Sequence, residues 1–537
     1  MSFARPSALS LLIAVVGACG RPAAEPAPAP AQATSGGAPR VVVLVVVDQL
    51  GEAAFERKLP FATGGFAELA RRGERLVGHL PYATSATAPG HAAMGTGAPP
   101  AVTGIIGNEW WDRAAGREVK AVEDPPGEAQ AARLRVDGVA DVLTRARPAS
   151  RAIAVALKDR SAILSLGHAG EPVWYDPHRP AMIGRGGKAP PWLGALADPE
   201  VMAGRVRSVW LPALPAGWLA AWSGGPDDAP ELAITGWTAS FPHATFTTPS
   251  AAEAEEVTPD GDRLVIDGAL AALRDLDLDD DAPDYLVVSL SAHDYILHAF
   301  GPDSWEAWDT FLRLDHDLDD LIGALDAKAG RGGWAMILTS DHGGPSSPER
   351  RRAGGLPGAR LTFEGIDAVA EQAAASVAGP GPWVSATRPP YAYLDARAAT
   401  LPPETRAKLI DAIAEALAHM PGLDGAWPTA SLAGGCDARE GDARAFCLSI
   451  DAERAGEVIY SPADGTAVVK AASPDTVTHG TVHRDDREVP ILIVAPGVHG
   501  GTRGAEVSTL QLAPTIAGLL GVPAPPAAAA PPIPLAE

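Results

Sequence analysis

The sequence predicts an α/β protein with a doubly wound, mostly parallel central sheet flanked by helices, and three observations lead to this fold class. Short apolar runs rich in branched residues recur along the chain, as in strands that are covered on both faces. Longer helix-like segments lie between and after these runs. Repeated alternation of strand and helix is typical of a sheet with helices packed on both sides.

The first of these stretches, VVVLVVVDQL, occupies residues 41–50, and its continuous apolar run ends in Asp48. Four more strands are expected over 151–160, 284–294, 334–344 and 489–497, and helices over 303–328 and 508–520. Tracts rich in Pro, Trp and Gly near 165–280 and 375–480 interrupt the alternation. We expect these two tracts to be insertions that cap the active face of one catalytic domain, residues 41–524.

The N-terminal segment indicates export. Residues 1–19 combine a positive charge with a short apolar run, and Val16-Gly17-Ala18-Cys19 resembles a bacterial lipobox. This predicts a lipoprotein-type signal peptide with a lipid anchor at Cys19, in the periplasm or cell envelope; a plain secretory signal is the alternative. Residues 20–40 form a Pro/Ala-rich tether, and residues 525–537 a similar tail.

The composition limits the partners. The formal net charge of −23 at pH 7 argues against nucleic-acid binding, which usually requires a basic surface. An acidic protein that binds a phosphate ester must therefore supply positive charge locally. In an exported protein Cys436 and Cys447 are expected to form a disulfide, with two free thiols as the alternative.

Charged side chains gather where the predicted strands end. Ligands of doubly wound sheets bind outside the carboxyl ends of the strands. Six such residues lie at or just past a strand end: Asp48, Lys158, Arg160, Asp294, Asp341 and His342.

Several of these residues are of the kinds that bind metals. Asp294 and His298 are four residues apart, so they share a face of a helical turn, and Asp341 is followed directly by His342. With Asp48 and His479 they form an oxygen and nitrogen donor set that suits zinc or manganese better than calcium or an iron–sulfur centre. Each has an ordinary interpretation on its own, such as a helix cap, and His91, His293 and His483 are interpreted as ordinary polar residues.

The segment YATSATAPGHAAMGTG contains a candidate nucleophile. Proline is favoured in the first helical turn, so the helix here is expected to start no earlier than Pro89. Thr87 would then hold its hydroxyl over the positive end of a helix, where anions bind. A hydroxyl needs a base or a metal to become a nucleophile, and from this stretch alone simple capping by Thr87, Thr84 or Ser85 is the stronger interpretation.

Taken in order, several motifs resemble the alkaline phosphatase superfamily. The resemblance runs from about residue 41 to 522 and is specifically to the threonine-nucleophile, phosphate-irrepressible bacterial alkaline phosphatases, which are related to nucleotide pyrophosphatase/phosphodiesterases. It is carried by VVVDQL, YATSATAPGHAAMGTG, GIIGNEWWD, ALKDRSAI, SLSAHDYILHAFG, TSDHGG, THGTVH and LAPTIAGLLGVPAP.

The resemblance implies a two-zinc site. Asp294, His298 and His479 would bind one Zn²⁺, and Asp48, Asp341 and His342 the second, with Thr87 as the nucleophile on that second metal. Asn108, Lys158 and Arg160 match the residues that contact the phosphoryl oxygens. The lysine and arginine favour a phosphate monoester, because it carries one more negative charge than a diester.

Other functions remain as alternatives or are excluded. A phosphodiesterase or nucleotide pyrophosphatase of the same superfamily is the nearest alternative, and a catalytically inactive binding homologue is a further one. TAPGH lacks the Cys or Ser context of a sulfatase, and the chain has no series of transmembrane helices like a phosphoethanolamine transferase. We expect a monomer that acts on small-molecule phosphate esters.

Overall fold

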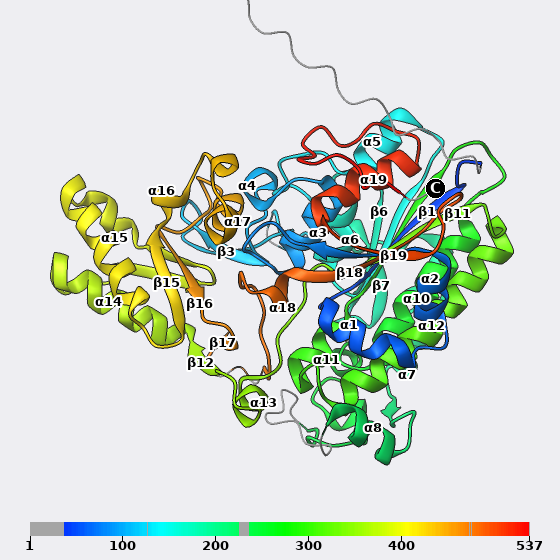
Figure 1. Ribbon diagram of the computed structural model, residues 1–537, viewed down its shortest axis with the longest axis horizontal. Coiled ribbons are helices and arrows are strands. Elements are labelled where there is room, and N and C mark those ends of the chain that lie inside the picture. The colour runs from blue at the N-terminus through cyan, green and yellow to red at the C-terminus, as the bar shows by residue number, and fades with distance from the viewer. Residues whose placement is uncertain (1–36, 126, 225–235, 472, 474, 536–537) are drawn as a thin grey trace, which may run out of the picture.

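The computed structural model describes residues 37–535 except 126, 225–235, 472 and 474. The predicted signal peptide and most of the predicted tether therefore lie outside the described residues. A nine-stranded mixed sheet forms the centre, in the order β19-β2-β18-β11-β1-β10-β5-β6-β7 (Figure 1). In sequence order these strands are β1 (Val41–Val47), β2 (Glu74–His79), β5 (Ala152–Ala156), β6 (Glu171–Asp176), β7 (Ala181–Gly184), β10 (Asp284–Leu290), β11 (Trp334–Thr339), β18 (Glu488–Val494) and β19 (Gly501–Ser508).

The centre of the sheet is parallel. β1 pairs in parallel with β10 and β11, β10 pairs in parallel with β5, and β5 with β6. Three pairs are antiparallel, namely β11 with β18, β18 with β2, and β6 with β7. The predicted fold class and all five predicted strands are confirmed, but the run at 489–497 enters the sheet antiparallel, because an apolar run fixes burial and not strand direction.

Helices cover both faces of the sheet, so it is doubly wound. Val41, Val43, Val45 and Val47 of β1 pack on one side, and Val42, Leu44 and Val46 on the other. The first side is covered by α1 (Glu52–Lys58), α2 (Gly65–Arg72), α10 (Pro259–Asp275), α11 (Ala292–Phe300) and α12 (Trp305–Ala329). The second side is covered by α3 (Thr87–Thr96), α5 (Val139–Ala146), α6 (Asp159–Leu166) and α19 (Leu512–Leu519). The helices predicted over 303–328 and 508–520 correspond to α12 and α19.

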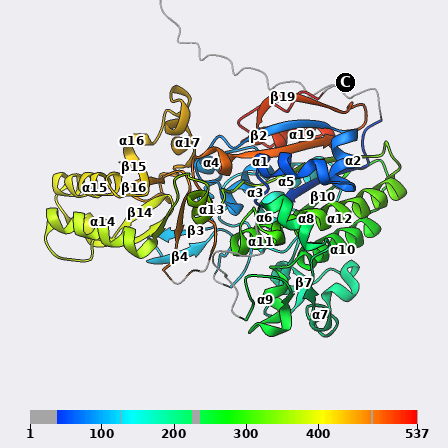
Figure 2. The same cartoon turned by 60° about the horizontal axis from the view of Figure 1, so that its bottom comes forward.

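The two predicted insertions differ in structure. Within 165–280, β6, β7 and α10 belong to the central layers, so the inserted part of the chain is shorter than the composition indicates. The helices that lie outside the central layers are α7 (Pro199–Arg205), α8 (Ala216–Ser223) and α9 (Ala251–Glu255). Within 375–480 lies a second, four-stranded sheet with its own apolar core, set beside the main body (Figures 1 and 2). Its strands are β13 (Val384–Arg388), β14 (Tyr391–Leu394), β16 (Val458–Pro462) and β15 (Leu423–Pro428), and α14 (Phe363–Ala378) and α15 (Pro403–Ala418) pack on them.

Two further sequence features have structural counterparts. Cys436 and Cys447 form a disulfide, so that prediction is confirmed. Among the described residues, no helix is both long enough and apolar enough to cross a bilayer.

The buried Lys58 predicts how stability depends on pH. Its side chain is fully buried against Trp308 and donates from Nζ to the carbonyl oxygen of Ala307 at 3.0 Å. Burial, helped by the charge of Arg57, lowers the pKa of Lys58 to about 7. The unfolded chain, with a lysine pKa of about 10.4, therefore binds a proton that the folded chain lacks between about pH 7 and 10.

We expect the Lys58→Met variant to be more stable than the parent at pH 7, with the difference shrinking by up to about 1.4 kcal/mol per pH unit as the pH rises towards 10. Urea unfolding at pH 7, 8.5 and 10 measures this. Parallel pH profiles for the two proteins would contradict a neutral lysine in the fold.

Candidate active site

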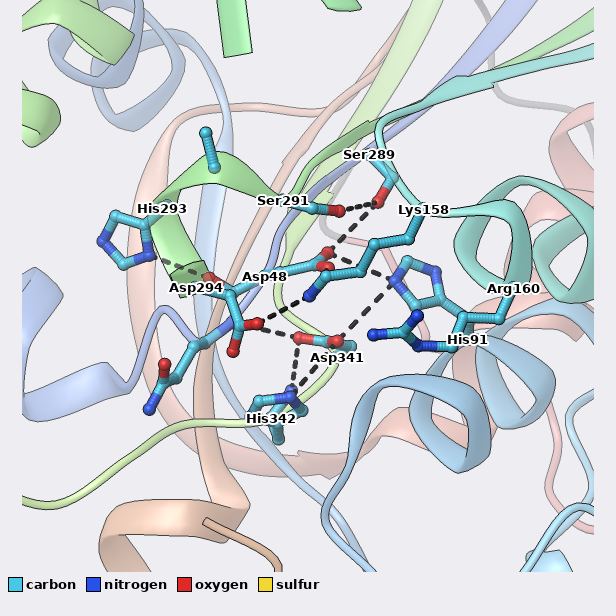
Figure 3. A network of polar contacts seen from close by, with 12 residues as sticks. Asp48, His91, Lys158, Arg160, Ser289, Ser291, His293, Asp294, Asp341 and His342 are labelled. Carbon is cyan, nitrogen blue, oxygen red and sulfur yellow. Dashed lines mark hydrogen bonds and ion pairs between the residues drawn. The ribbon is translucent and has the colours of Figure 1, made fainter. Parts of the chain in front are cut away.

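Residues distant in sequence converge at one edge of the central sheet (Figure 3). Asp48 directly follows β1, Asp294 lies in the first turn of α11 after β10, and Asp341 follows β11 by two residues. β1, β10 and β11 are parallel neighbours, so their carboxyl ends meet at the same edge. This topology explains why the three carboxylates, more than 200 residues apart at the extremes, lie close together.

The first cluster consists of Asp294, His298 and His479. Nε2 of His298 lies 3.4 Å and Nε2 of His479 3.8 Å from Asp294 Oδ1. His298 donates from Nδ1 to the carbonyl oxygen of Val477 at 2.8 Å, and His479 donates from Nδ1 to the carbonyl oxygen of Ser85, also at 2.8 Å. In the neutral form each ring therefore carries its lone pair on Nε2, which faces the carboxylate, and this is the usual arrangement of histidine metal ligands. Asp294 outweighs burial and raises the pKa of His298 to about 8, so binding of a cation there would release a proton.

The second cluster contains Asp48 and Asp341, with two histidines beside them. His342 donates from Nδ1 to the carbonyl oxygen of Gly343 at 2.9 Å, and its Nε2 lies 3.4 Å from Asp341 Oδ2. His91 reaches the same carboxylates from α3, with Nε2 3.2 Å from Asp48 Oδ1 and 3.6 Å from Asp341 Oδ2. The rings of His342 and His479 stack with centroids 3.7 Å apart, so the two clusters are adjacent.

The donor atoms of these clusters fit divalent cations. Asp341 Oδ2 and His342 Nε2 are buried and make no hydrogen bond to any described residue. Burial and the neighbouring charge of Asp48 raise the pKa of Asp341 to about 7, a sign of surplus negative charge that a cation would relieve. Burial lowers the pKa of His342. Burial also lowers the pKa of His479, and the nearby rings of His342 and His298 lower it further. Both rings are therefore neutral and able to bind a metal.

Thr87 is the first residue of α3 and is almost completely buried. The helix thus begins two residues before Pro89, earlier than the sequence predicts, because the first helical N–H groups have no partner within the helix and a proline at the third position sacrifices none. The cap residue of α3 is Ala86, which has no capping side chain, and the N–H of Ala88 donates to Asn108 Oδ1 instead, so the structure gives no support to the capping interpretation of Thr87, Thr84 or Ser85. Gly90 is required in this helix, because a Cβ there would lie 2.5 Å from the carbonyl oxygen of Asp341.

Lys158 lies between the two clusters. Its Nζ is 2.6 Å from Asp294 Oδ2 and 3.2 Å from Asp48 Oδ2, and its side chain is fully buried (Figure 3). These carboxylates outweigh the desolvation of the ammonium and raise its pKa, so Lys158 is charged. The same ammonium, together with His91, outweighs burial and holds the pKa of Asp48 well below its usual value.

Two further predicted residues surround this position. Arg160 lies in the first turn of α6, and its buried Nε has no hydrogen-bond partner among the described residues. Asn108 accepts a hydrogen bond at Oδ1 from the N–H of Ala88, 2.8 Å away, which fixes its amide beside Thr87. Together with the clusters, the structure brings all the predicted site residues to one region.

Sequence reasoning missed residues that support the site. His91 was interpreted as an ordinary polar residue. Gln49, in the left-handed region at a φ of 62°, donates from its N–H to Asp341 Oδ1 at 3.1 Å, and such strained backbone often marks functional sites. Asp262 of α10 accepts from the N–H groups of Ala292 and His293 and so holds the first turn of α11. The sequence could have indicated only His91, because it lies four residues after Thr87 and so on the same face of a helix. Nothing in the sequence indicates Gln49 or Asp262.

Comparison with known proteins shows which family this chain resembles. A family model described as type I phosphodiesterase / nucleotide pyrophosphatase matches residues 42–485. Alkaline phosphatase PhoV of Synechococcus elongatus is 33% identical over 349 residues, which is 61% of this chain and 62% of the relative, less than two thirds of its length. Alkaline phosphatase PhoD of Zymomonas mobilis is 28% identical over 507 residues, 90% of this chain and 86% of the relative. The crystal structure of wild-type alkaline phosphatase PafA matches with a TM-score of 0.83 and 27% identity, over 93% of this chain and 98% of that one.

The sheet and the similarity to these proteins place the chain in the alkaline phosphatase superfamily. Within that class, the chain belongs to the type I phosphodiesterase / nucleotide pyrophosphatase family.

Proposed function

We propose that this protein is an exported, metal-dependent phosphatase that hydrolyses small phosphate monoesters through a covalent phosphothreonine at Thr87. Asp294, His298 and His479 would hold one Zn²⁺, and Asp48, Asp341 and His342 a second. Oxygen and neutral imidazole donors without sulfur suit zinc in preference to calcium. Two bound cations would neutralise the apical oxygens of an in-line displacement and lower the pKa of the threonine hydroxyl.

The position of Lys158 carries this proposal. Its ammonium lies between the two clusters, within 3.2 Å of a carboxylate from each. Arg160 has a free buried Nε nearby, in a chain whose formal net charge is −23. Two cationic donors at the centre of an acidic protein provide the local positive charge that a doubly charged phosphoryl group requires.

The residues of the chain then have distinct roles. Asn108, Lys158 and Arg160 bind the non-bridging oxygens and place phosphorus in line with the Thr87 hydroxyl. The threonine hydroxyl loses its proton to water and its oxygen forms a bond to phosphorus as the bond to the leaving oxygen breaks. The leaving alkoxide then takes up a proton from water. Water then attacks the phosphothreonine from the opposite side, which releases inorganic phosphate and restores the hydroxyl.

Phosphodiester hydrolysis is the second candidate, and the family match favours it. Both reactions use the same nucleophile and the same cations. The difference lies in the non-bridging oxygens, because a diester has one negative charge less and gains less from Lys158 and Arg160.

An activity profile tests the function. The zinc-loaded protein is assayed with p-nitrophenyl phosphate and bis-p-nitrophenyl phosphate, its zinc content is measured by mass spectrometry, and Thr87→Ala is the control. We expect two zinc ions per chain and a higher kcat/KM for the monoester. A higher kcat/KM for the diester would establish the second candidate. A protein that binds no zinc and stays inactive after zinc is added would be a catalytically inactive binding homologue.

The predicted cellular location is tested separately. We propose a lipid anchor at Cys19 that holds the protein in the periplasm or cell envelope. The Cys19→Ala variant should move from the membrane fraction to the soluble fraction of a bacterial host, and retention in the membrane fraction would contradict the anchor.

A further inference from the structure

We propose that His91 is a positioning residue that orients Asp48 and couples the helix of the nucleophile to the second cation site, without binding the cation. The proposal rests on the two-cation function proposed above. His91 is fully buried on α3 and lies against the second cluster (Figure 3). By distance alone, Asp48, His91 and Asp341 could form a metal site, so the role of the imidazole depends on which of its nitrogens carries hydrogen.

The hydrogen bonds of His91 decide this point. Its Nε2 lies 3.2 Å from Asp48 Oδ1, and an ionised carboxylate only accepts, so Nε2 carries the hydrogen and donates. With the hydrogen on Nε2, Nδ1 accepts from the hydroxyl of Ser165, whose Oγ lies 2.8 Å away. Both nitrogens of His91 are thus engaged, and neither has a lone pair left for a cation.

The three predicted histidine ligands have the opposite arrangement. Each donates from Nδ1 to a backbone carbonyl oxygen, so the neutral ring carries its lone pair on Nε2. These histidines are His298, His342 and His479, and their acceptors are Val477, Gly343 and Ser85. His342 therefore supplies the imidazole ligand of the second site, and His91 donates a hydrogen bond to another ligand of that site, Asp48.

His91 fixes one oxygen of Asp48, and the other oxygen faces the centre of the site. Asp48 Oδ1 accepts from His91 Nε2 and, at 3.1 Å, from Ser289 Oγ. These two donors turn Oδ2 towards the centre, where it faces the Lys158 ammonium. A carboxylate held in this way keeps its free oxygen oriented for a cation and loses less rotational freedom when it binds.

His91 also connects the second site to the nucleophile. Thr87 and His91 are four residues apart on α3 and therefore lie on the same face of the helix. At Gly90 the backbone of α3 packs directly on Asp341, because a Cβ on this residue would lie 2.5 Å from the carbonyl oxygen of Asp341. The hydrogen bond from His91 to Asp48 thus links the helix that begins with Thr87 to the end of β1.

The test measures metal binding. The His91→Ala, His91→Gln and Ser165→Ala variants are compared with the parent, and Met94→Ala, which removes another buried side chain from α3, is the matched control. The affinity of each zinc equivalent is measured by competition with a chromophoric chelator, and the visible spectrum of the Co²⁺-substituted protein reports the ligand set.

We expect His91→Ala to lose about 10–100-fold in affinity for one zinc equivalent and to keep the other unchanged. His91→Gln retains an N–H that can reach Asp48, so it should recover most of the affinity and keep the Co²⁺ spectrum of the parent. Ser165→Ala should weaken the same equivalent less than His91→Ala does, and Met94→Ala should weaken neither. If His91→Ala does not fold, the glutamine and Ser165 variants provide the result.

Two results would overturn the proposal. Unchanged affinities in His91→Ala would show that the imidazole does not act on the site. An equal loss in His91→Gln together with a shifted Co²⁺ spectrum would make His91 a direct ligand. A parent protein that binds no zinc would contradict the proposed function instead, so the two failures are distinguishable.

Discussion

Replacing Thr87 with alanine should lower kcat for a phosphate monoester at least about 1000-fold, while the protein stays folded and keeps its bound zinc. The threonine hydroxyl is the group that we propose to bond to phosphorus, and no other described residue places a hydroxyl at the same start of α3. Steady-state kinetics with p-nitrophenyl phosphate, together with zinc analysis, measures the effect. Because the binding residues are unchanged, KM should change much less than kcat.

Serine at the same position is the control for this prediction. The Thr87→Ser variant keeps a hydroxyl on the first residue of α3 and should retain substantial activity, with a phosphoserine that can be trapped by rapid acid quenching. A Thr87→Ala variant with near-parental kcat would rule out the covalent mechanism, even if the zinc sites were intact.

The paired substitution Lys158→Ala and Arg160→Ala should lower kcat/KM for monoesters by about 100–10,000-fold, at about 1.5–3 kcal/mol for each charged hydrogen bond lost. The loss for diesters should be clearly smaller, because the diester carries one negative charge fewer. The ratio of the two kcat/KM values measures the effect and cancels any general loss of active protein.

Lys158 also contacts two predicted zinc ligands, so zinc content must be measured in each variant before the ratio is interpreted. The matched control is Arg57→Ala, which removes a cation paired with Asp303 at 2.9 Å and outside the site. Equal losses for monoester and diester would contradict a role for the pair in recognising the extra charge.

The strands and most of the site were predictable because they are encoded locally. VVVLVVV is apolar at every position, so it can only be a strand covered on both faces, and the aspartate that follows it must lie at the sheet edge. The disulfide followed from two cysteines in a chain predicted to be exported. Asp294 and His298 share a helical face by spacing alone.

Other features were not predictable from local patterns. The direction of β18 depends on its neighbours β11 and β2, and nothing in PILIV encodes it. The first turn of α3 uses a partner outside its own segment, because the N–H of Ala88 donates to Oδ1 of Asn108. His91 appeared ordinary because its partners Asp48 and Ser165 are 43 and 74 residues away.

The sequence by itself determined the fold class and which residue types reach the edge of the sheet, because burial and periodicity are properties of short segments. Only the tertiary structure decided which group faces Nδ1 of each histidine, a backbone carbonyl or the hydroxyl of Ser165. That choice depends on hydrogen-bond partners contributed by distant segments, and it separates the three imidazoles that donate from Nδ1 to a carbonyl oxygen from His91, whose Nε2 we propose to donate to Asp48.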